Sequence, residues 1–182
     1  PNLSLAGIFS PSNRPEPDSL AIQQVDANNP TIFALIQRLV EDITSVPLQL
    51  VSSTGADEFQ IVDEHPSLIP IRRPNEVETS RLFFQQVAAD LIWMGDGFVW
   101  TDGDPATGTL PQNFIRLHPS QVTPQPPKVP NGKIIDHYDW VNGDGRAQAI
   151  DPLALLHFRT RNPDSVYRGK GIGARLRDWL NL

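Results

Sequence analysis

Proline recurs eighteen times in this chain of 182 residues, and that frequency constrains the fold more than any other feature. It is about twice the usual share of roughly 5%. Proline lacks a backbone N–H and fixes φ, so it interrupts helices and is kept out of the interior of sheets. The sequence therefore predicts many short elements joined at fixed bends, and it argues against a bundle of long helices.

Two segments nevertheless carry the apolar repeat of an amphipathic helix. The first begins at Asn29, a good N-cap, with Pro30 in the first helical position, and Pro47 ends it. The second begins near Thr79, and either Asn75 or Thr79 could cap it. The apolar stripes are Ile32, Leu35, Ile36, Leu39, Val40 and Ile43 in the first helix, and Phe84, Val87, Ala88, Leu91 and Ile92 in the second, widened by Phe83 and Met94.

Most of the remaining chain has the pattern of short strands. Val46, Leu48 and Leu50 alternate as a strand with one buried face, and "FQIV" follows a turn as its return strand. Prolines cut residues 66–74 into short turns. Beyond residue 97, "FVWTDGDPATGTLPQNFIRL" predicts two strands, "KIIDHYDWVNGDGRAQAI" a hairpin and "LALLHFRT" a further strand, before a helix begins in "GKGIGARLRDWLNL".

These elements predict an α+β fold, with two amphipathic helices packed on mostly antiparallel short strands. Residues 1–28 are expected to form a proline-rich arm and 29–160 the α+β domain. Residues 161–182 are expected to form a loop and the start of a helix.

The stretch "MGDGFVW", residues 94–100, allows two interpretations. A carboxylate between two glycines can belong to a catalytic loop, or it can mark the joint between a helix and a strand. Either Gly95 or Gly97 could take the positive φ that closes a helix, and Phe98 and Trp100 would share one face of the following strand. Glycine and aspartate are common in turns, so the joint is the favoured interpretation.

Composition excludes several classes of protein. The net charge of −6 argues against a domain that grips nucleic acid by neutralising phosphates. The absence of cysteine excludes disulfides and thiolate metal sites. No apolar run approaches the roughly 20 residues that a membrane-spanning helix needs, so no membrane association is expected.

No catalytic, cofactor or metal site emerges from the motifs. The four histidines, His65, His118, His137 and His157, lack the spacing of metal ligands on one face. The segment "DGDPATGTLPQN" fails as a calcium loop after its second ligand. "RGKGIGAR" matches neither phosphate-binding glycine motif and more simply lets a loop turn into the last helix. There is no GxSxG elbow.

The order of the segments resembles the N-terminal half of the portal proteins of tailed bacteriophages, over residues 29–175. The resemblance lies in Val46-Pro47-Leu48 after the first helix, His65-Pro66, Pro74-Asn75 before the second helix, the Gly95-Asp96-Gly97-Phe98 joint, Ile115 to Pro119, Leu156 to Arg159, and Gly171-Ile172-Gly173. Asp96 and Phe98 replace the small polar residue and tyrosine usual in the joint, and "GIG" replaces a Ser-Pro turn. The family's stem and clip would lie beyond residue 182, so the chain resembles the wing domain truncated before the stem.

The resemblance implies a homo-oligomeric ring, commonly of twelve subunits, at one vertex of the virion capsid. Such a ring would assemble in the bacterial host cytoplasm and carry no enzymatic activity. Double-stranded DNA would pass through it during packaging and ejection, and the terminase motor, the capsid and the neck or tail proteins would dock on it. A closed ring requires two different complementary surfaces on each subunit. The candidates for these surfaces are the proline-rich arm, residues 1–28, and the cationic segment of residues 159–175. The candidate interface residues are Arg159, Arg161, Arg168, Lys170, Arg175 and Trp179.

Two other hypotheses make distinct predictions. A small hydrolase would need a deep pocket in which at least two of four turn carboxylates converge, namely Asp96, Asp102, Asp104 and Asp144. A stand-alone phage binding or adhesion module would expose an aromatic patch including Trp100, Tyr138 and Trp140. For the portal hypothesis, we expect residues 1–182 alone to be a monomer or a weak oligomer in light scattering.

Overall fold

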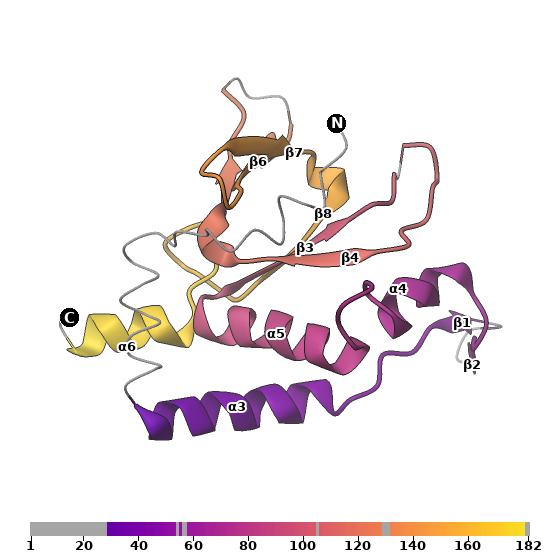
Figure 1. The fold of residues 1–182 in the computed structure, drawn as a ribbon, viewed down its shortest axis with the longest axis horizontal. Helices are drawn as coiled ribbons and strands as arrows, with labels where there is room; N and C mark the ends of the chain where they lie inside the picture. Colours follow the sequence, from indigo (N-terminus) through magenta and orange to yellow (C-terminus); the bar gives the residue numbers. More distant parts are fainter. Residues whose placement is uncertain (1–28, 54, 56–57, 105, 129–131, 181–182) are drawn as a thin grey trace.

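The computed structural model describes residues 29–180, except residues 54, 56–57, 105 and 129–131. The secondary structure stacks in successive layers (Figure 1): helix α3, helix α5, a sheet of order β4-β3-β8 and a second sheet of order β5-β6-β7. The strand pairs of the described residues are antiparallel. The predicted α+β class is confirmed, whereas the predicted arm, residues 1–28, lies outside the described residues.

The two amphipathic helices begin and end where their capping residues predict. Helix α3 spans Pro30–Thr44, and the side chain of Asn29 accepts hydrogen bonds from the backbone N–H groups of Thr31 and Ile32, both at 3.2 Å. Helix α5 spans Ser80–Trp93, with Thr79 as its cap. Asn75 has a different role: its side chain closes the turn before the helix by accepting from Val77 and Glu78.

Helix α5 buries more of its surface than the predicted stripe, because it lies between two layers. Ala88 and Trp93 pack with Ile36 and Val40 of α3. On its other side, Phe83 and Val87 pack against Val99 of the sheet. The sequence pattern put Phe84 in the stripe and Phe83 at its widened edge; the fully buried aromatic residue is Phe83, and Phe84 packs beside it.

Strand β3 (Asp96–Thr101) is the centre of the first sheet, between β4 (Phe114–Leu117) and β8 (Leu155–Arg159). Its consecutive residues Phe98 and Val99 belong to different core clusters, one on each face of the sheet. Burial on both faces explains why the sequence has an unbroken apolar run at this point instead of an alternating pattern.

The second sheet contains β5 (Val122–Gln125), β6 (His137–Val141) and β7 (Ala147–Ile150). The hairpin predicted around Asn142 to Gly145 is confirmed, since β6 and β7 pair on either side of it. The main core lies between the two sheets and consists of Phe98, Ile115, Leu117, Val122, Tyr138, Trp140, Ile150 and Leu155.

The short elements are mostly as the prolines predict. Helical turns η1 (Pro66–Leu68) and α4 (Ile69–Arg72) occupy the proline-rich segment, and η2 (Pro119–Gln121) and η3 (Pro152–Ala154) precede β5 and β8. Helix α6 spans Ile172–Leu180.

The strand predicted at residues 46–50 is wrong. Val46 and Leu48 are exposed, and residues 46–50 belong to no strand, although the Leu50 carbonyl accepts a hydrogen bond from the Val62 N–H at 2.9 Å. The strand begins only at β1 (Val51–Ser53), which pairs with β2 (Phe59–Ile61) as the sequence predicts. Alternation in the sequence marks a strand only where a partner lies alongside, and the β1–β2 pairing begins at Val51.

An ion pair links helix α5 to the first sheet. Arg116 of β4 donates to both carboxylate oxygens of the buried Asp90, at 2.5 and 2.7 Å. We expect Asp90→Ala to lower the free energy of unfolding by about 2 kcal/mol, because it leaves a partly buried guanidinium without its partner. Denaturant titration measures this, with the exposed pair of Arg38 and Asp42 as the control. If Asp42→Ala lowers the free energy of unfolding as much as Asp90→Ala does, the Asp90–Arg116 pair makes no special contribution to stability.

Candidate functional site: the junction around Asp96

The joint between α5 and β3 is built on a glycine and a buried carboxylate. Gly95 has φ +91°, which confirms the predicted positive-φ joint and assigns it to Gly95, while Gly97 already belongs to strand β3. Asp96 opens the strand with only 1% of its surface exposed. A buried carboxylate is stable only when donors satisfy its oxygens, so its partners determine what this site can do.

Three groups from distant parts of the sequence converge on the Asp96 carboxylate. The backbone N–H of Gly169 donates to Oδ1 at 2.8 Å, and His157 Nε2 of β8 lies 2.9 Å from the same oxygen. Arg168 Nε lies 3.1 Å from Oδ2. The carboxylate thus joins the end of α5, strand β8 and the loop that leads to α6. We call these four residues the Asp96 junction.

Arg168 extends the junction to the second sheet. Its guanidinium donates to the backbone carbonyls of Val122 at 2.6 Å and Pro119 at 3.1 Å. The same group lies 5.6 Å from the centre of the Phe98 ring, within the range of a cation–π contact. One side chain therefore connects the loop, the α5–β3 joint and the start of β5.

The glycines of "RGKGIGAR" allow the loop to pack directly on the joint. A Cβ at Gly169 would overlap the carbonyl group of Gly95, and one at Gly171 would overlap the backbone of Trp93. Thr160 completes the contact, since its N–H donates to the Gly95 carbonyl at 2.9 Å. Sequence analysis explained these glycines by a sharp turn alone. The close approach of two backbones is the additional reason, and it depends on residues some 75 positions apart.

The junction contains an Asp-His-Tyr chain, because the Tyr138 hydroxyl lies 3.2 Å from His157 Nδ1. Tyr138 is itself a core residue, and burial raises its pKa, so the hydroxyl stays protonated near neutral pH. Asp96, His157 and Tyr138 line neither of the two hollows described below. The groups satisfy one another inside the protein, and this arrangement fixes backbone positions.

The four carboxylates of the hydrolase hypothesis do not converge. Asp102 accepts from the backbone N–H groups of Gln112 and Asn113, at 2.8 and 2.9 Å. Partial burial opposes its charge, but the hydrogen bonds from Asn113 and Gln112 outweigh that and lower its pKa. Asp104 accepts from Ala106 in the same long turn, and Asp144 is exposed in the β6–β7 turn. The arrangement that this hypothesis requires is not met among the described residues.

The adhesion hypothesis also lacks its predicted surface. Tyr138 and Trp140 are buried in the core between the sheets, and Trp100 packs against that core. The three aromatic residues therefore form no exposed patch.

Two histidines that precede proline have matching structural roles. His65 and His118 each begin a helical turn, and each Nδ1 accepts from the backbone N–H of a serine two residues later, Ser67 or Ser120. His65 is exposed, whereas burial lowers the pKa of His118 below its usual 6.5. The nearby Asp90 charge opposes this shift, and Arg116 reinforces it.

This pair allows a pH-dependent prediction. The unfolded chain takes up a proton on His118 near pH 6.5, whereas the folded chain does so only at lower pH. The contribution of neutral His118 to stability is therefore fully present above pH 6.5, and the free energy of unfolding falls as the pH drops below that value. We expect His118→Gln to remove part of this acid-induced loss, while His65→Gln leaves it unchanged. Denaturant titrations between pH 7.5 and 5 measure both variants. Equal pH profiles for wild type and His118→Gln would contradict the prediction.

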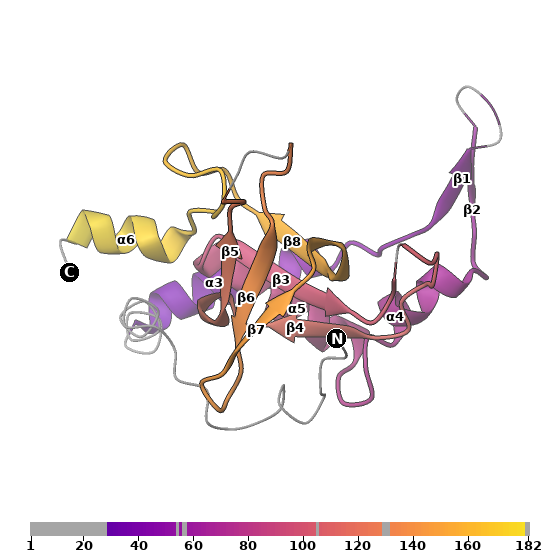
Figure 2. The same ribbon diagram turned by 90° about the horizontal axis from the view of Figure 1, so that it is seen from above.

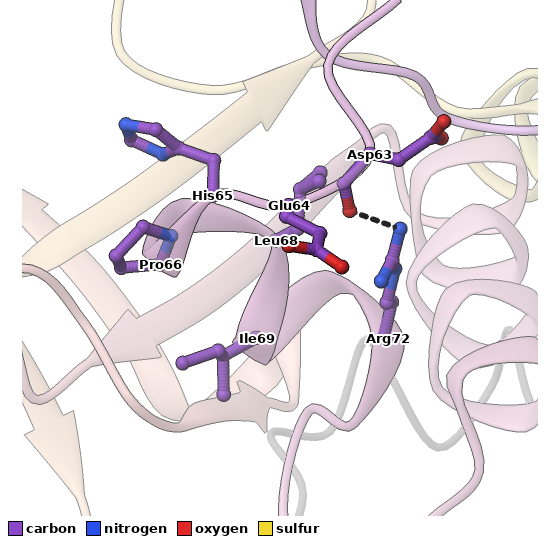
Figure 3. Close-up of a pocket in the computed structure, with 7 residues that line it drawn as sticks. All are labelled: Asp63, Glu64, His65, Pro66, Leu68, Ile69 and Arg72. Carbon is purple, nitrogen blue, oxygen red and sulfur yellow. Dashed lines mark hydrogen bonds between the residues drawn. The ribbon is translucent and has the colours of Figure 1, made fainter.

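Two open hollows mark the surface. The first holds about 370 Å³ beside α4 (Figure 3), where Arg72 donates to the Asp63 carbonyl at 2.7 Å and the His65 ring points away from that pair. Its lining residues are Asp63, Glu64, His65, Pro66, Leu68, Ile69 and Arg72. The second, of about 260 Å³, lies between α3, α5 and the start of α6. It is lined by Leu39, Ile43, Ile92, Thr160, Lys170, Gly171, Ile172 and Arg175.

The candidate interface residues occupy different environments. Arg161 and Arg175 are exposed, and Arg159 is exposed with a hydrogen bond to the Val166 carbonyl. Arg168 belongs to the Asp96 junction, and Lys170 lies 3.6 Å from Asp164. The Trp179 side chain lies outside the described part of the chain. Their role between subunits stays a prediction, and Arg168 has an intramolecular role that the sequence pattern did not indicate.

Two further observations apply to the described residues. They contain no group of three or more side chains suited to hold a metal ion. Over the same ranges, no helix combines the length and the apolar character needed to cross a membrane.

Comparison with known structures shows the same fold in larger proteins. One match is the "Neck of empty GTA particle computed with C6 symmetry", with 20% identity and a TM-score of 0.75, covering 97% of this chain and 47% of the other. A second is the "Virion of native gene transfer agent (GTA) particle", with 20% identity, a TM-score of 0.71 and coverage of 98% and 47%. A third is the "Neck of native GTA particle computed with C12 symmetry", with 18% identity, a TM-score of 0.64 and coverage of 92% and 44%.

The present chain thus spans about half the length of the chains it matches. A search among curated proteins finds none that is similar. The family model described as phage portal protein matches residues 30–182, which is most of the sequence. This match agrees with the order of the helix, the glycine joint and the β8 strand described above, and the chain belongs to the phage portal protein family.

Proposed function

We propose that the chain forms part of a portal ring at one vertex of a phage-like capsid. The observation that carries the proposal is the family match over residues 30–182. The neck structures with C6 and C12 symmetry support a ring of repeated copies, and we propose twelve. In this proposal the ring assembles in the bacterial host cytoplasm, and it remains in the virion as a docking platform for the terminase motor, the capsid and the neck or tail proteins.

The proposed work is architectural and includes no bond chemistry. Double-stranded DNA would pass through the ring during packaging and ejection without recognition of its sequence. The net charge of −6 supports this, because an acidic wall repels phosphates and does not retard the moving duplex. The Asp96 junction supports it as well, since its polar groups hold the helix layer, both sheets and the loop before α6 in one rigid arrangement.

Deletion of the gene from the particle-producing genome tests the proposal. We expect cells that lack the protein to assemble capsids without nuclease-protected DNA, and a plasmid copy of the native-length gene to restore packaging. Electron microscopy of the purified native-length protein should show closed rings. Normal amounts of packaged DNA without the gene, or only monomers at high protein concentration, would refute the proposal.

A further inference from the structure

The β1–β2 hairpin has one apolar face. Its register pairs Val51 with Ile61 and Ser53 with Phe59, and these four residues lie on the same side because side chains alternate along a strand. Ser52 and Gln60 lie on the other side. Val51, Phe59 and Ile61 are all exposed, with 71% of the Phe59 surface accessible to solvent. We call these three residues the hairpin apolar face.

The hairpin projects from the body of the protein, and none of the other described strands pairs with it (Figure 2). A two-stranded hairpin alone is at best marginally stable in water, and it gains stability when its apolar face is covered. An exposed cluster of this kind on a projecting element is typical of a surface that contacts another molecule.

The hollow between α3, α5 and α6 has the complementary character. Its lining is mainly apolar, from Leu39, Ile43, Ile92 and Ile172, and it also includes Lys170 and Arg175. We call it the helix groove. Its volume of about 260 Å³ falls below the ~300–1,000 Å³ typical of small-molecule sites. Its size and open form therefore fit one or two apolar side chains better than a metabolite.

The matching apolar character of the hairpin apolar face and the helix groove, together with their positions, indicates a second copy of this chain as the occupant. The hairpin lies at one end of the molecule, and α6, whose first turn borders the helix groove, lies at the other (Figures 1 and 2). A head-to-tail ring requires two different complementary surfaces placed in this way.

We propose that the hairpin apolar face of one subunit sits in the helix groove of the next subunit around the ring. This inference rests on the proposed ring function and adds to it a named contact between copies. It makes Phe59 the central side chain, with Ile43 and Ile92 beneath it. The contact lies outside the predicted arm and only partly within residues 159–175, the two candidate interfaces of sequence analysis.

Paired cysteines test this contact, and residues 1–182 add no cysteine of their own to the background, which the unsubstituted native-length protein measures. The variant Phe59→Cys/Ile43→Cys, in the native-length protein, is treated with a mild oxidant and separated on a denaturing gel without reductant. We expect a ladder of covalent oligomers whose band intensity is at least about tenfold that of the controls. The contact between subunits would hold the two cysteines close together, which gives them a high effective concentration. The controls are Phe59→Cys alone and Phe59→Cys/Val77→Cys, since Val77 is exposed but lies outside the helix groove.

Electron microscopy of the same samples distinguishes failure of the hairpin contact from failure of the proposed ring function. Closed rings without a specific ladder would overturn the hairpin contact and leave the ring function intact. Absence of rings and of ladders would overturn both. Equal dimer formation by Phe59→Cys alone would show that hairpins meet each other, and a cross-linked monomer would show that the hairpin reaches its own groove. Either result would also overturn the inference.

Discussion

Replacement of Asp96 by alanine is expected to lower the free energy of unfolding by about 3 to 5 kcal/mol, the usual cost of breaking a buried ion pair. The substitution leaves Arg168 and His157 without their shared acceptor and the Gly169 N–H without a partner. It also frees the loop before α6 from the α5–β3 joint. Denaturant titration measures the stability, and limited proteolysis of residues 160–171 measures the release of the loop.

Two further variants make this prediction specific. Asp144→Ala removes an equally charged but exposed turn residue and should leave stability within about 0.5 kcal/mol of wild type. Asp96→Asn keeps an oxygen for the Gly169 N–H and loses the charge that pairs with Arg168, so an intermediate loss is expected. Equal stabilities for Asp96→Ala and Asp144→Ala would show that the junction does not hold the layers together.

The second large effect is expected from Gly169→Ala. The added methyl group would overlap the Gly95 carbonyl, and backbone atoms cannot yield as a flexible side chain can. We expect a loss of about 3 kcal/mol, at the upper end for overpacked sites, or detachment of the loop from the joint. Unfolding curves register the first outcome and proteolysis of the loop registers the second.

Gly55→Ala is the matched control, since a Cβ at Gly55 would meet no atom within 4 Å. Its stability and cleavage rate should equal those of wild type. If Gly169→Ala gave the same result as this control in both assays, the loop would not pack on Gly95 as described.

Local sequence signals were sufficient for most of the secondary structure. Asn29 with Pro30 fixed the start of α3 and Pro47 marked its end, because capping and proline geometry act over a few residues. The turn at Asn142 to Gly145 likewise predicted the β6–β7 hairpin. Predictions were wrong or incomplete where the structure of a segment depends on a second element that packs against it. Leu48, predicted in a strand, lies outside the paired strands and is exposed. Phe83, predicted at the edge of the α5 stripe, is fully buried because α5 has a sheet on its second side.

The candidate site likewise contains a local feature that the sequence predicted and long-range contacts that it did not. The glycine at position 95 predicted a joint, and the structure confirms it through its positive φ. No periodicity relates Asp96 to His157 and Arg168, which follow it by 61 and 72 positions, so their association could not be inferred from spacing. The glycines on both sides of Lys170 were the available signal, since a loop with little side-chain bulk allows another backbone to approach closely.

By itself, the sequence determined where helices, turns and hairpins begin and end, because caps, prolines and glycines act on their immediate neighbours. It also indicated the family through the order of those elements. Only the tertiary structure decided that Asp96 is a buried partner of Arg168 and that the apolar face of β1–β2 is exposed. Both depend on which surfaces meet when the layers stack, and packing between distant segments leaves no local pattern.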